Sequence, residues 1–562
     1  MTRAGLEPGG RLRRIPARIA WTVAIAVPLA FLAVFFAWPV GAILLRGIVA
    51  DGRVDLGAFG DVLGAGRTYR ILAQTLWMAF AGTLGSVLLG IPGAYILYRC
   101  RFPGRAVLRG LATVPFVLPT VVVGMAFRAL LSERGPLGFL GLDGTTTAVV
   151  LAMIFFNFSV VVRQVGTLWA TLDPRTAEAA RTLGASPFRA FRTVTLPRLG
   201  PAIASAGSLV FLYCSTAFGI VLTLGSPGYG TLETEIYLQT RVHLDLPVAA
   251  VLSILQFLIV LAAVIVSNRV RLGTETSLRL RETKDAPLGR ADAWPAAITF
   301  ATIGILILSP LAALVVRSFQ RGGEWSLGNY ALLATSGSGF AGGATVLQAL
   351  EHSLRIALDA AVIALVIGIP LALVLSRRSR SPGVLRTQRV IDGAVMLPLG
   401  VSAVTVGFGF IVSLQAWSPQ LAHSGLLVPL AQAVVALPLV VRSLVPVLRA
   451  IDPRLREAAM TLGASPGRVL RTVDGPFLVR GLGLAAGFAF AVSLGEFGAT
   501  SFLASPNYVT LPVLIVRLLG RPGADNYGMA LAGAVILAVV TATVMIVCER
   551  LRPRGVREGQ GW

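Results

Sequence analysis

Lysine, histidine and cysteine are nearly absent from this chain of 562 residues, which holds three cysteines, three histidines and a single lysine, Lys284. The cysteines and histidines are scattered without ligand spacing, so the sequence predicts no disulfide framework and no metal site, and no cofactor is expected. A Walker A loop needs a lysine after a glycine-rich run, but Lys284 lies in R-E-T-K-D with no glycine just before it. We therefore expect ATP hydrolysis, if the protein depends on it, to take place on another polypeptide.

Charged side chains are also scarce. Only 13% of the residues are charged and 55% are hydrophobic, and the mean hydropathy is +0.78. A soluble domain of this length needs more charge to cover its surface, so we expect an integral membrane protein. Paired catalytic carboxylates, a nucleophile elbow and H-E-x-x-H are all missing from the sequence, which predicts a non-catalytic protein. The net charge of +23 comes largely from arginines in short loops beside apolar runs, a pattern that orients membrane spans rather than one that binds nucleic acid.

Apolar runs long enough to cross a bilayer recur along the whole chain. They predict an all-α polytopic membrane protein of about twelve helices, arranged as six plus six around a polar linker. The predicted parts are a first half at 1–267, a linker at 268–293 and a second half at 294–562. The densest basic loops alternate along the chain, which predicts that both termini are cytoplasmic. The predicted spans are 19–45, 71–98, 108–131, 147–170, 199–224, 246–267, 295–316, 353–376, 391–414, 425–448, 480–503 and 527–548.

One stretch occurs twice, which indicates a tandem duplication. Residues 173–187 read D-P-R-T-A-E-A-A-R-T-L-G-A-S-P, and residues 452–466, which lie 279 positions later, read D-P-R-L-R-E-A-A-M-T-L-G-A-S-P. In each copy an Asp-Pro pair starts a short helix, a glycine ends it, and a Ser-Pro pair starts a second helix. Gly184 and Gly463 are therefore predicted to adopt a positive φ.

Each copy resembles the EAA loop of ABC importer permeases, whose pattern is E-A-A, three residues, a glycine and a distal L-P. The loops are predicted at 173–198 and 452–477, and the second departs from the pattern because Gly475 replaces the leucine before the distal proline. The resemblance implies a fold like that of ABC type I importer permeases. It also implies two copies of a cytoplasmic ABC ATPase as partners, and an extracytoplasmic solute-binding protein. The residues that it places at the ATPase contact are Glu178, Ala179, Ala180, Gly184, Glu457, Ala458, Ala459 and Gly463.

An ionisable residue inside a predicted span is a candidate functional residue. Glu496 lies in S-L-G-E-F-G-A-T within the predicted span 480–503, and Ala217 takes its place in the first half. The sequence around Glu496 resembles that of permeases of ferric-iron, thiamine, molybdate and sulfate importers. Two roles are open for Glu496 and the neighbouring Phe497. They line the pathway or its gate, or Glu496 is a structural carboxylate that bonds to neighbouring helices, for example through Arg442.

The fused six-plus-six arrangement resembles that of bacterial thiamine and ferric-iron permeases. T-L-E-T-E-I-Y at 231–237 is more similar to the thiamine type. The sequence therefore predicts a permease subunit of an ATP-driven importer in a bacterial cytoplasmic membrane, with a thiamine-like solute or ferric iron as cargo. The alternative is a secondary active transporter with duplicated topology. Such carriers place coupling sites at mid-membrane in both halves, whereas here the cytoplasmic loops are the duplicated feature, which favours the importer.

Overall fold

The computed structural model describes residues 14–550 apart from 51–52, 55, 227, 273–285, 339–342, 378–380, 416–424 and 506–507. The centre of the predicted linker, with Lys284, and both ends of the chain therefore lie outside the described residues. The described part is almost entirely helical. Its only strands are three pairs of two residues each, β1 (Val49–Ala50) with β2 (Arg53–Val54), β3 (Cys100–Arg101) with β4 (Ala286–Pro287), and β5 (Gln320–Arg321) with β6 (Glu324–Trp325).

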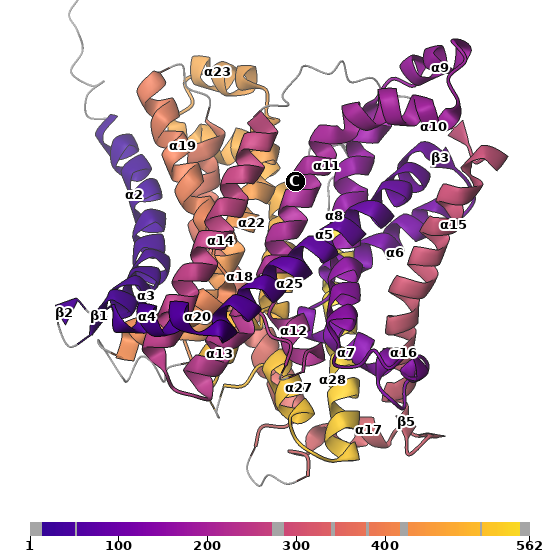
Figure 1. Ribbon diagram of the computed structural model, residues 1–562. Coiled ribbons are helices and arrows are strands. Elements are labelled where there is room, and N and C mark those ends of the chain that lie inside the picture. The colour runs from indigo at the N-terminus through magenta and orange to yellow at the C-terminus, as the bar shows by residue number, and fades with distance from the viewer. Residues whose placement is uncertain are drawn as a thin grey trace, which may run out of the picture.

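The first repeat supplies thirteen described helices, whose long apolar members span the molecule from end to end (Figure 1). They are α2 (Arg14–Leu32), α3 (Trp38–Ile48), α4 (Gly57–Gly64), α5 (Gly66–Arg99), α6 (Arg105–Val117), α7 (Thr120–Leu131), α8 (Thr146–Thr171), α9 (Arg175–Thr182), α10 (Pro187–Ala190), α11 (Leu196–Ser215), α12 (Gly219–Leu224), α13 (Leu232–Arg241) and α14 (Leu246–Leu272).

The second repeat follows the same order. Its described helices are α15 (Ala293–Ala301), α16 (Ser309–Ser318), α17 (Gly328–Ala331), α18 (Val346–Ser376), α19 (Pro382–Met396), α20 (Ala403–Gln415), α22 (Leu427–Arg449), α23 (Pro453–Thr461), α24 (Pro466–Val469), α25 (Gly475–Gly495), α26 (Gly498–Leu503), α27 (Leu511–Leu519) and α28 (Ala524–Arg550). Short turns with π or 3-10 geometry connect or continue them, at η1 (Ala33–Ala37), η2 (Gly138–Leu140), η3 (Phe191–Thr195), η4 (Arg290–Asp292), η5 (Thr302–Leu308), η6 (Leu332–Ala334), η7 (Leu397–Gly400) and η8 (Leu470–Asp474).

Ten described helices or continuous helix runs are long and apolar enough to cross a membrane, and two bent helix pairs raise the number to twelve if each pair is one span. The prediction of an all-α polytopic protein is thus confirmed. Two predicted spans are not straight, however. The run 108–131 bends by 108° between α6 and α7, and the run 391–414 bends by 95° between η7 and α20. Pro119 and Ser402 lie at these bends, and although a proline can interrupt a helix, each run was predicted as one continuous span because it is apolar overall.

Two further predicted spans end early. The runs 199–224 and 480–503 were expected to be single helices, but α11 stops at Ser215 and α25 stops at Gly495. Short helices α12 and α26 follow after breaks of a few residues, in equivalent places of the two repeats. Glu496 therefore lies in a break between helices and not inside a span. These segments are apolar on average although Glu496 and several glycines lie in them, so hydropathy averaged over a whole span did not locate the breaks.

The repeats are not two separately packed bodies, because each sends its first helix to the other. Phe31 and Leu32 of α2 lie in one hydrophobic core with residues of α18 and α22 in the second repeat. In return, α15 packs on α5, where the Tyr95 hydroxyl donates to the Asp292 carboxylate just before α15 at 2.8 Å. Exchanging these helices buries apolar surface between the repeats, so the two halves form one unit.

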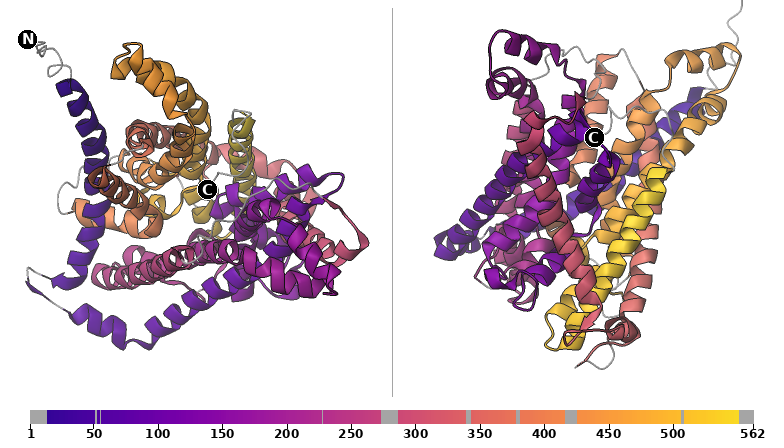
Figure 2. Two further views of the ribbon diagram at one scale, coloured as in Figure 1. Left: turned by 90° about the horizontal axis from the view of Figure 1, so that it is seen from above. Right: turned by 90° about the vertical axis from the view of Figure 1, so that its right-hand side faces the viewer.

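Both repeated loops project from the same end of the molecule. The helices α9 and α10 form one loop and α23 and α24 the other, at the top of Figure 1. Figure 2 shows them on separate arms when the molecule is turned. The helices α17 and α27 lie at the opposite end (Figure 1). The two repeated loops therefore lie on one side of the molecule.

Candidate functional site

The two repeated loops, hereafter the elbows (173–187 and 452–466), have the geometry that the sequence predicts. Asp173 Oδ1 accepts a hydrogen bond from the Arg175 N–H at 3.0 Å, and Asp452 Oδ1 accepts one from the Arg454 N–H at 2.9 Å. The helix stops are left-handed, with φ of +89° at Gly184 and +79° at Gly463. Because only glycine tolerates this conformation readily, the sharp turn between the two short helices follows from the sequence.

The elbow surfaces are exposed in the same pattern in both repeats. Glu178, Ala179 and Gly184 are exposed and Ala180 is half-buried, and the equivalent residues Glu457, Ala458, Gly463 and Ala459 repeat this pattern. Beside each glycine an apolar side chain points into solvent, since Leu183 is 89% and Leu462 is 88% exposed. The two elbows therefore present the same residue types to solvent, although one exposed leucine at each tip is not by itself an apolar patch.

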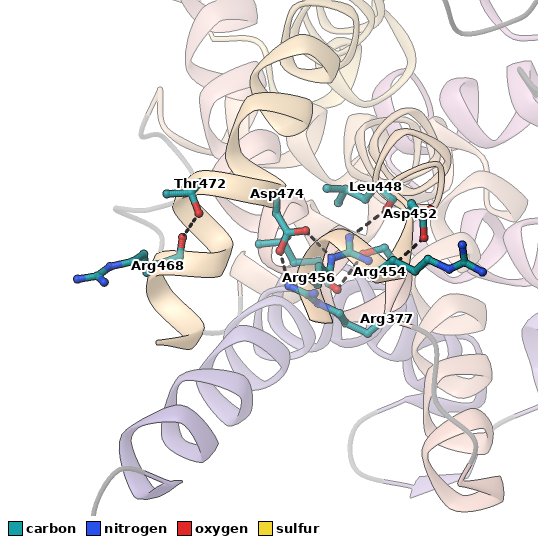
Figure 3. Close-up of polar contacts among 10 residues, drawn as sticks. Arg377, Leu448, Asp452, Arg454, Arg456, Arg468, Thr472 and Asp474 are labelled. Carbon is teal, nitrogen blue, oxygen red and sulfur yellow. Dashed lines mark hydrogen bonds and ion pairs between the residues drawn. The ribbon is translucent and has the colours of Figure 1, made fainter. Parts of the chain in front are cut away.

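The second elbow is tied to the membrane helices by a buried carboxylate that sequence reasoning missed. Asp474, at the end of η8, is fully buried, and its two oxygens accept from Arg377 at 2.6 Å and from Arg456 at 2.7 Å (Figure 3). Arg456 belongs to α23, and Arg377 directly follows α18. The arginine density of these segments was visible in the sequence, but nothing local links positions 377, 456 and 474.

At the breaks after α11 and α25, equivalent residues of the two repeats meet. Phe218 and Phe497 stack with ring centroids 5.2 Å apart and an interplanar angle of 14°. The two residues are 279 positions apart, which is the same shift that relates the two elbows. They are therefore equivalent residues of the two repeats in direct contact. Phe497 was a sequence candidate, whereas Phe218 was missed, although the shift of 279 residues pairs it with Phe497.

Glu496 acts as a helix cap. Its carboxylate accepts from the backbone N–H of Ala499 at 2.8 Å, the N–H of Thr500 at 3.0 Å and the Thr500 hydroxyl at 2.5 Å, all in the first turn of α26. The suggested pairing with Arg442 is wrong, because Arg442 is exposed and its Nε donates to the Met396 sulfur at 3.2 Å. A carboxylate at the N-terminus of a short helix satisfies its free N–H groups, which the sequence did not reveal because the break itself was not predicted.

A cavity of about 300 Å³ lies beside the phenylalanine pair. It is lined by residues of α13, α26 and α27, among them Tyr237, Arg241, Phe497 and Arg517. Arg241 of the first repeat donates to the backbone carbonyls of Ser501 and Phe502 in the second, at 3.2 and 2.6 Å. The cavity is therefore formed between the repeats, and Phe497 of the stacked pair lines it. Within the described residues, no three histidine, cysteine, aspartate or glutamate side chains are grouped to hold a metal ion.

Comparison with known proteins places these features in a family. Residues 86–272 match the family model "Binding-protein-dependent transport system inner membrane component". The thiamine transport system permease protein ThiP of Brucella suis is 28% identical over 548 residues, covering 94% of this chain and 95% of that protein. ThiP of Escherichia coli is 28% identical, covering 87% of this chain and 90% of the relative.

Shorter relatives match only part of the chain. The putative 2-aminoethylphosphonate transport system permease protein PhnU of Salmonella typhimurium is 31% identical over 253 residues, which are 42% of this chain and 87% of PhnU. Among solved structures, a bacterial ABC transporter for the import of alginate is similar with a TM-score of 0.41 at 18% identity, covering 47% of this chain and all of that one. The chain therefore belongs to the inner-membrane components of binding-protein-dependent transport systems, as the membrane-spanning permease subunit of an ABC importer.

Proposed function

We propose that this permease carries thiamine, or a closely similar organic solute, across a bacterial cytoplasmic membrane. The observation that carries the proposal is the similarity to thiamine permeases over 94% of the chain, which spans both repeats. The 2-aminoethylphosphonate relative covers 42% of the chain only. Ferric iron, the other solute that the sequence suggested, is not supported by the relatives described above and is not proposed.

The elbows are the proposed contact sites for two ATPase subunits, one at each repeat. Their equal geometry, their position at one end and their exposed tips at Leu183 and Leu462 support this assignment. The contact residues are those of the E-A-A segments and the two glycines. The elbow end is then the cytoplasmic end, where α2 also begins (Figure 1), so that the N-terminus is cytoplasmic; the C-terminus is assigned to the same side. The repeats keep the division 1–267 and 294–562, with 268–293 as a cytoplasmic linker.

The stacked Phe218 and Phe497 are the proposed gate between the repeats. Phe218 lies just after the end of α11 and Phe497 just after the end of α25. Each of these two spans begins near an elbow. A change in the separation of the elbows would be transmitted along these spans and would part or close the rings. In this arrangement Glu496 holds the gate segment by capping α26, and does not itself carry the solute.

The cavity beside the gate bears on how the solute is chosen. Arg241 and Arg517 line it, and their positive charges oppose a cation such as thiamine. We therefore assign recognition of thiamine to the extracytoplasmic binding protein. The solute would pass the aromatic pair without being held in the arginine-lined cavity.

Two measurements test the proposal. The first is calorimetric titration of the cognate binding protein with thiamine and, separately, with 2-aminoethylphosphonate. Binding of the second compound alone would refute the assigned solute. The second is uptake into vesicles that contain the permease with or without its ATPase. We expect uptake only with the ATPase and ATP, and no specific ATP binding by the purified permease alone. Uptake without the ATPase would refute the ATP-driven mechanism.

A further inference from the structure

The two elbows are attached to the membrane helices in different ways. In the second repeat the link is ionic, through Asp474, Arg456 and Arg377. In the first repeat, 279 positions earlier, Thr195 replaces Asp474 and Ala177 replaces Arg456. There the nearest counterpart is a hydrogen bond from the Arg198 guanidinium to the Thr176 hydroxyl at 2.6 Å. The difference concerns only the base of the elbow, because its tip is nearly identical in the two repeats.

The ionic group, hereafter the clamp (Arg377, Arg456 and Asp474), joins elements that are distant in the sequence. Figure 3 shows Arg456 and Arg377 approaching Asp474 together. The Asp474 side chain is 0% exposed, Arg456 14% and Arg377 30%. Arg456 also donates to the Leu448 carbonyl in α22 at 3.2 Å. The clamp thus connects the elbow helix α23 with the ends of α18 and α22 and with the start of α25.

Asp474 connects the clamp to α25, the helix that leads to Phe497. Asp474 is the residue directly before α25, and α25 ends at Gly495, just before Glu496 and Phe497. An elbow that is fixed to Asp474 cannot tilt without moving the start of this helix. Because a hydrogen-bonded helix of 21 residues is stiff, the displacement reaches the gate ring at its other end.

We propose that the clamp couples motion of the second elbow to motion of α25 by holding this elbow rigidly. The first elbow is held less rigidly. This rests on the proposed function, in which the elbows receive the ATPase. The three residues are positioning residues, since they touch neither ATP nor the solute. Two short charge-assisted hydrogen bonds to one buried carboxylate resist angular change more strongly than one bond between neutral and charged groups at the first elbow.

The first test measures elbow motion on the whole chain in lipid nanodiscs, without the ATPase. Spin labels are placed on cysteines at Leu462 and Val479, in a background without the three native cysteines, and electron spin resonance gives their distance distribution. Both sites are exposed. The equivalent pair in the first repeat is Leu183 and Gly200, and a side chain at Gly200 meets nothing within 4 Å. We expect the second pair to give the narrower distribution.

Asp474→Asn removes the charge while keeping the shape of the side chain. We expect it to broaden the Leu462–Val479 distribution by about twofold or more and to leave the first elbow unchanged. Arg456→Gln is the milder second variant, because Asp474 keeps Arg377 and the fold is retained. Thr195→Ala is the matched control at the equivalent position of the first repeat, and it should change neither distribution. An unchanged distribution in both clamp variants would overturn the proposal.

The second test measures coupling in the permease–ATPase complex in vesicles. We expect both clamp variants to hydrolyse about tenfold more ATP per solute molecule imported than the unchanged complex, with the ATPase still bound. Thr195→Ala should keep the normal ratio. A merely structural role would lower the amount of complex without changing this ratio, and that result would overturn the proposal. If the unchanged complex imports nothing, the proposed function fails, and the spin-label distances still decide whether the clamp stiffens the elbow.

Discussion

Removing the carboxylate of Glu496 tests whether it caps the gate helix or acts through its charge. The side chain is 7% exposed and accepts three hydrogen bonds from the first turn of α26. Glu496→Ala leaves the N–H groups of Ala499 and Thr500 buried without an acceptor. Each such loss costs about 1–3 kcal/mol, so we expect a destabilisation of about 2–6 kcal/mol from these two N–H groups, to which the lost bond of the Thr500 hydroxyl adds.

Glu496→Gln is the sharper variant, because its amide oxygen still accepts one of these bonds. Its NH₂ group cannot accept from the second N–H, so the expected cost is that of one lost acceptor, about 1–3 kcal/mol. The structural role therefore predicts that the alanine variant unfolds at a clearly lower temperature than the glutamine variant. It also predicts that the glutamine variant retains transport in proportion to the folded protein.

The assay is thermal unfolding of the purified permease in detergent, followed by uptake in vesicles with the ATPase. Ser493→Ala is the matched control, since the Ser493 hydroxyl is buried near this break and has no hydrogen-bond partner in the described part of the chain. That variant should unfold near the temperature of the unchanged protein. Capping would be refuted by an alanine variant as stable as the control. Loss of uptake in a stable glutamine variant would instead show that the charge itself is needed.

Three further predictions concern the elbows, one buried acid and the orientation. Valine at both Gly184 and Gly463 is strained by about 1–3 kcal/mol at each positive φ, but its side chain meets open space. The double variant should therefore fold and yet lose both co-purification with the ATPase and solute uptake. Normal uptake would show that the elbows do not take part in coupling. Burial raises the pKa of Glu233 in α13 from 4.5 to about 8, so stability should fall as the pH rises across that window, and Glu233→Gln should flatten this dependence in unfolding scans at several pH values. Single cysteines at Tyr229 and Leu462, which are 43% and 88% exposed, should react with an impermeant reagent from outside only at Tyr229; the reverse would invert the topology.

The sequence by itself determined the membrane class, the duplication and the elbow geometry. These features depend on residues close together in the chain. An apolar run long enough to cross a bilayer predicts a membrane span whatever the rest of the fold is. An Asp-Pro start and a glycine stop act through hydrogen bonds within one or two turns, so Gly184 and Gly463 had to be left-handed wherever the elbow lay. For the same reason the two copies could be recognised as equal before their positions in space were known.

The breaks and the contacts across the molecule were decided only by the tertiary structure. Hydropathy averaged over a segment has the same value whether the helix is straight or broken, so the break at Glu496 and its capping of α26 were not predicted, and Arg442 was wrongly suggested as the partner of Glu496. Phe218 and Phe497 stack because two repeats pack face to face, and Asp474 meets Arg377 and Arg456 because three chain segments converge. Contacts between residues this far apart depend on how whole helices pack, and that information is distributed over the entire core rather than contained in any local pattern.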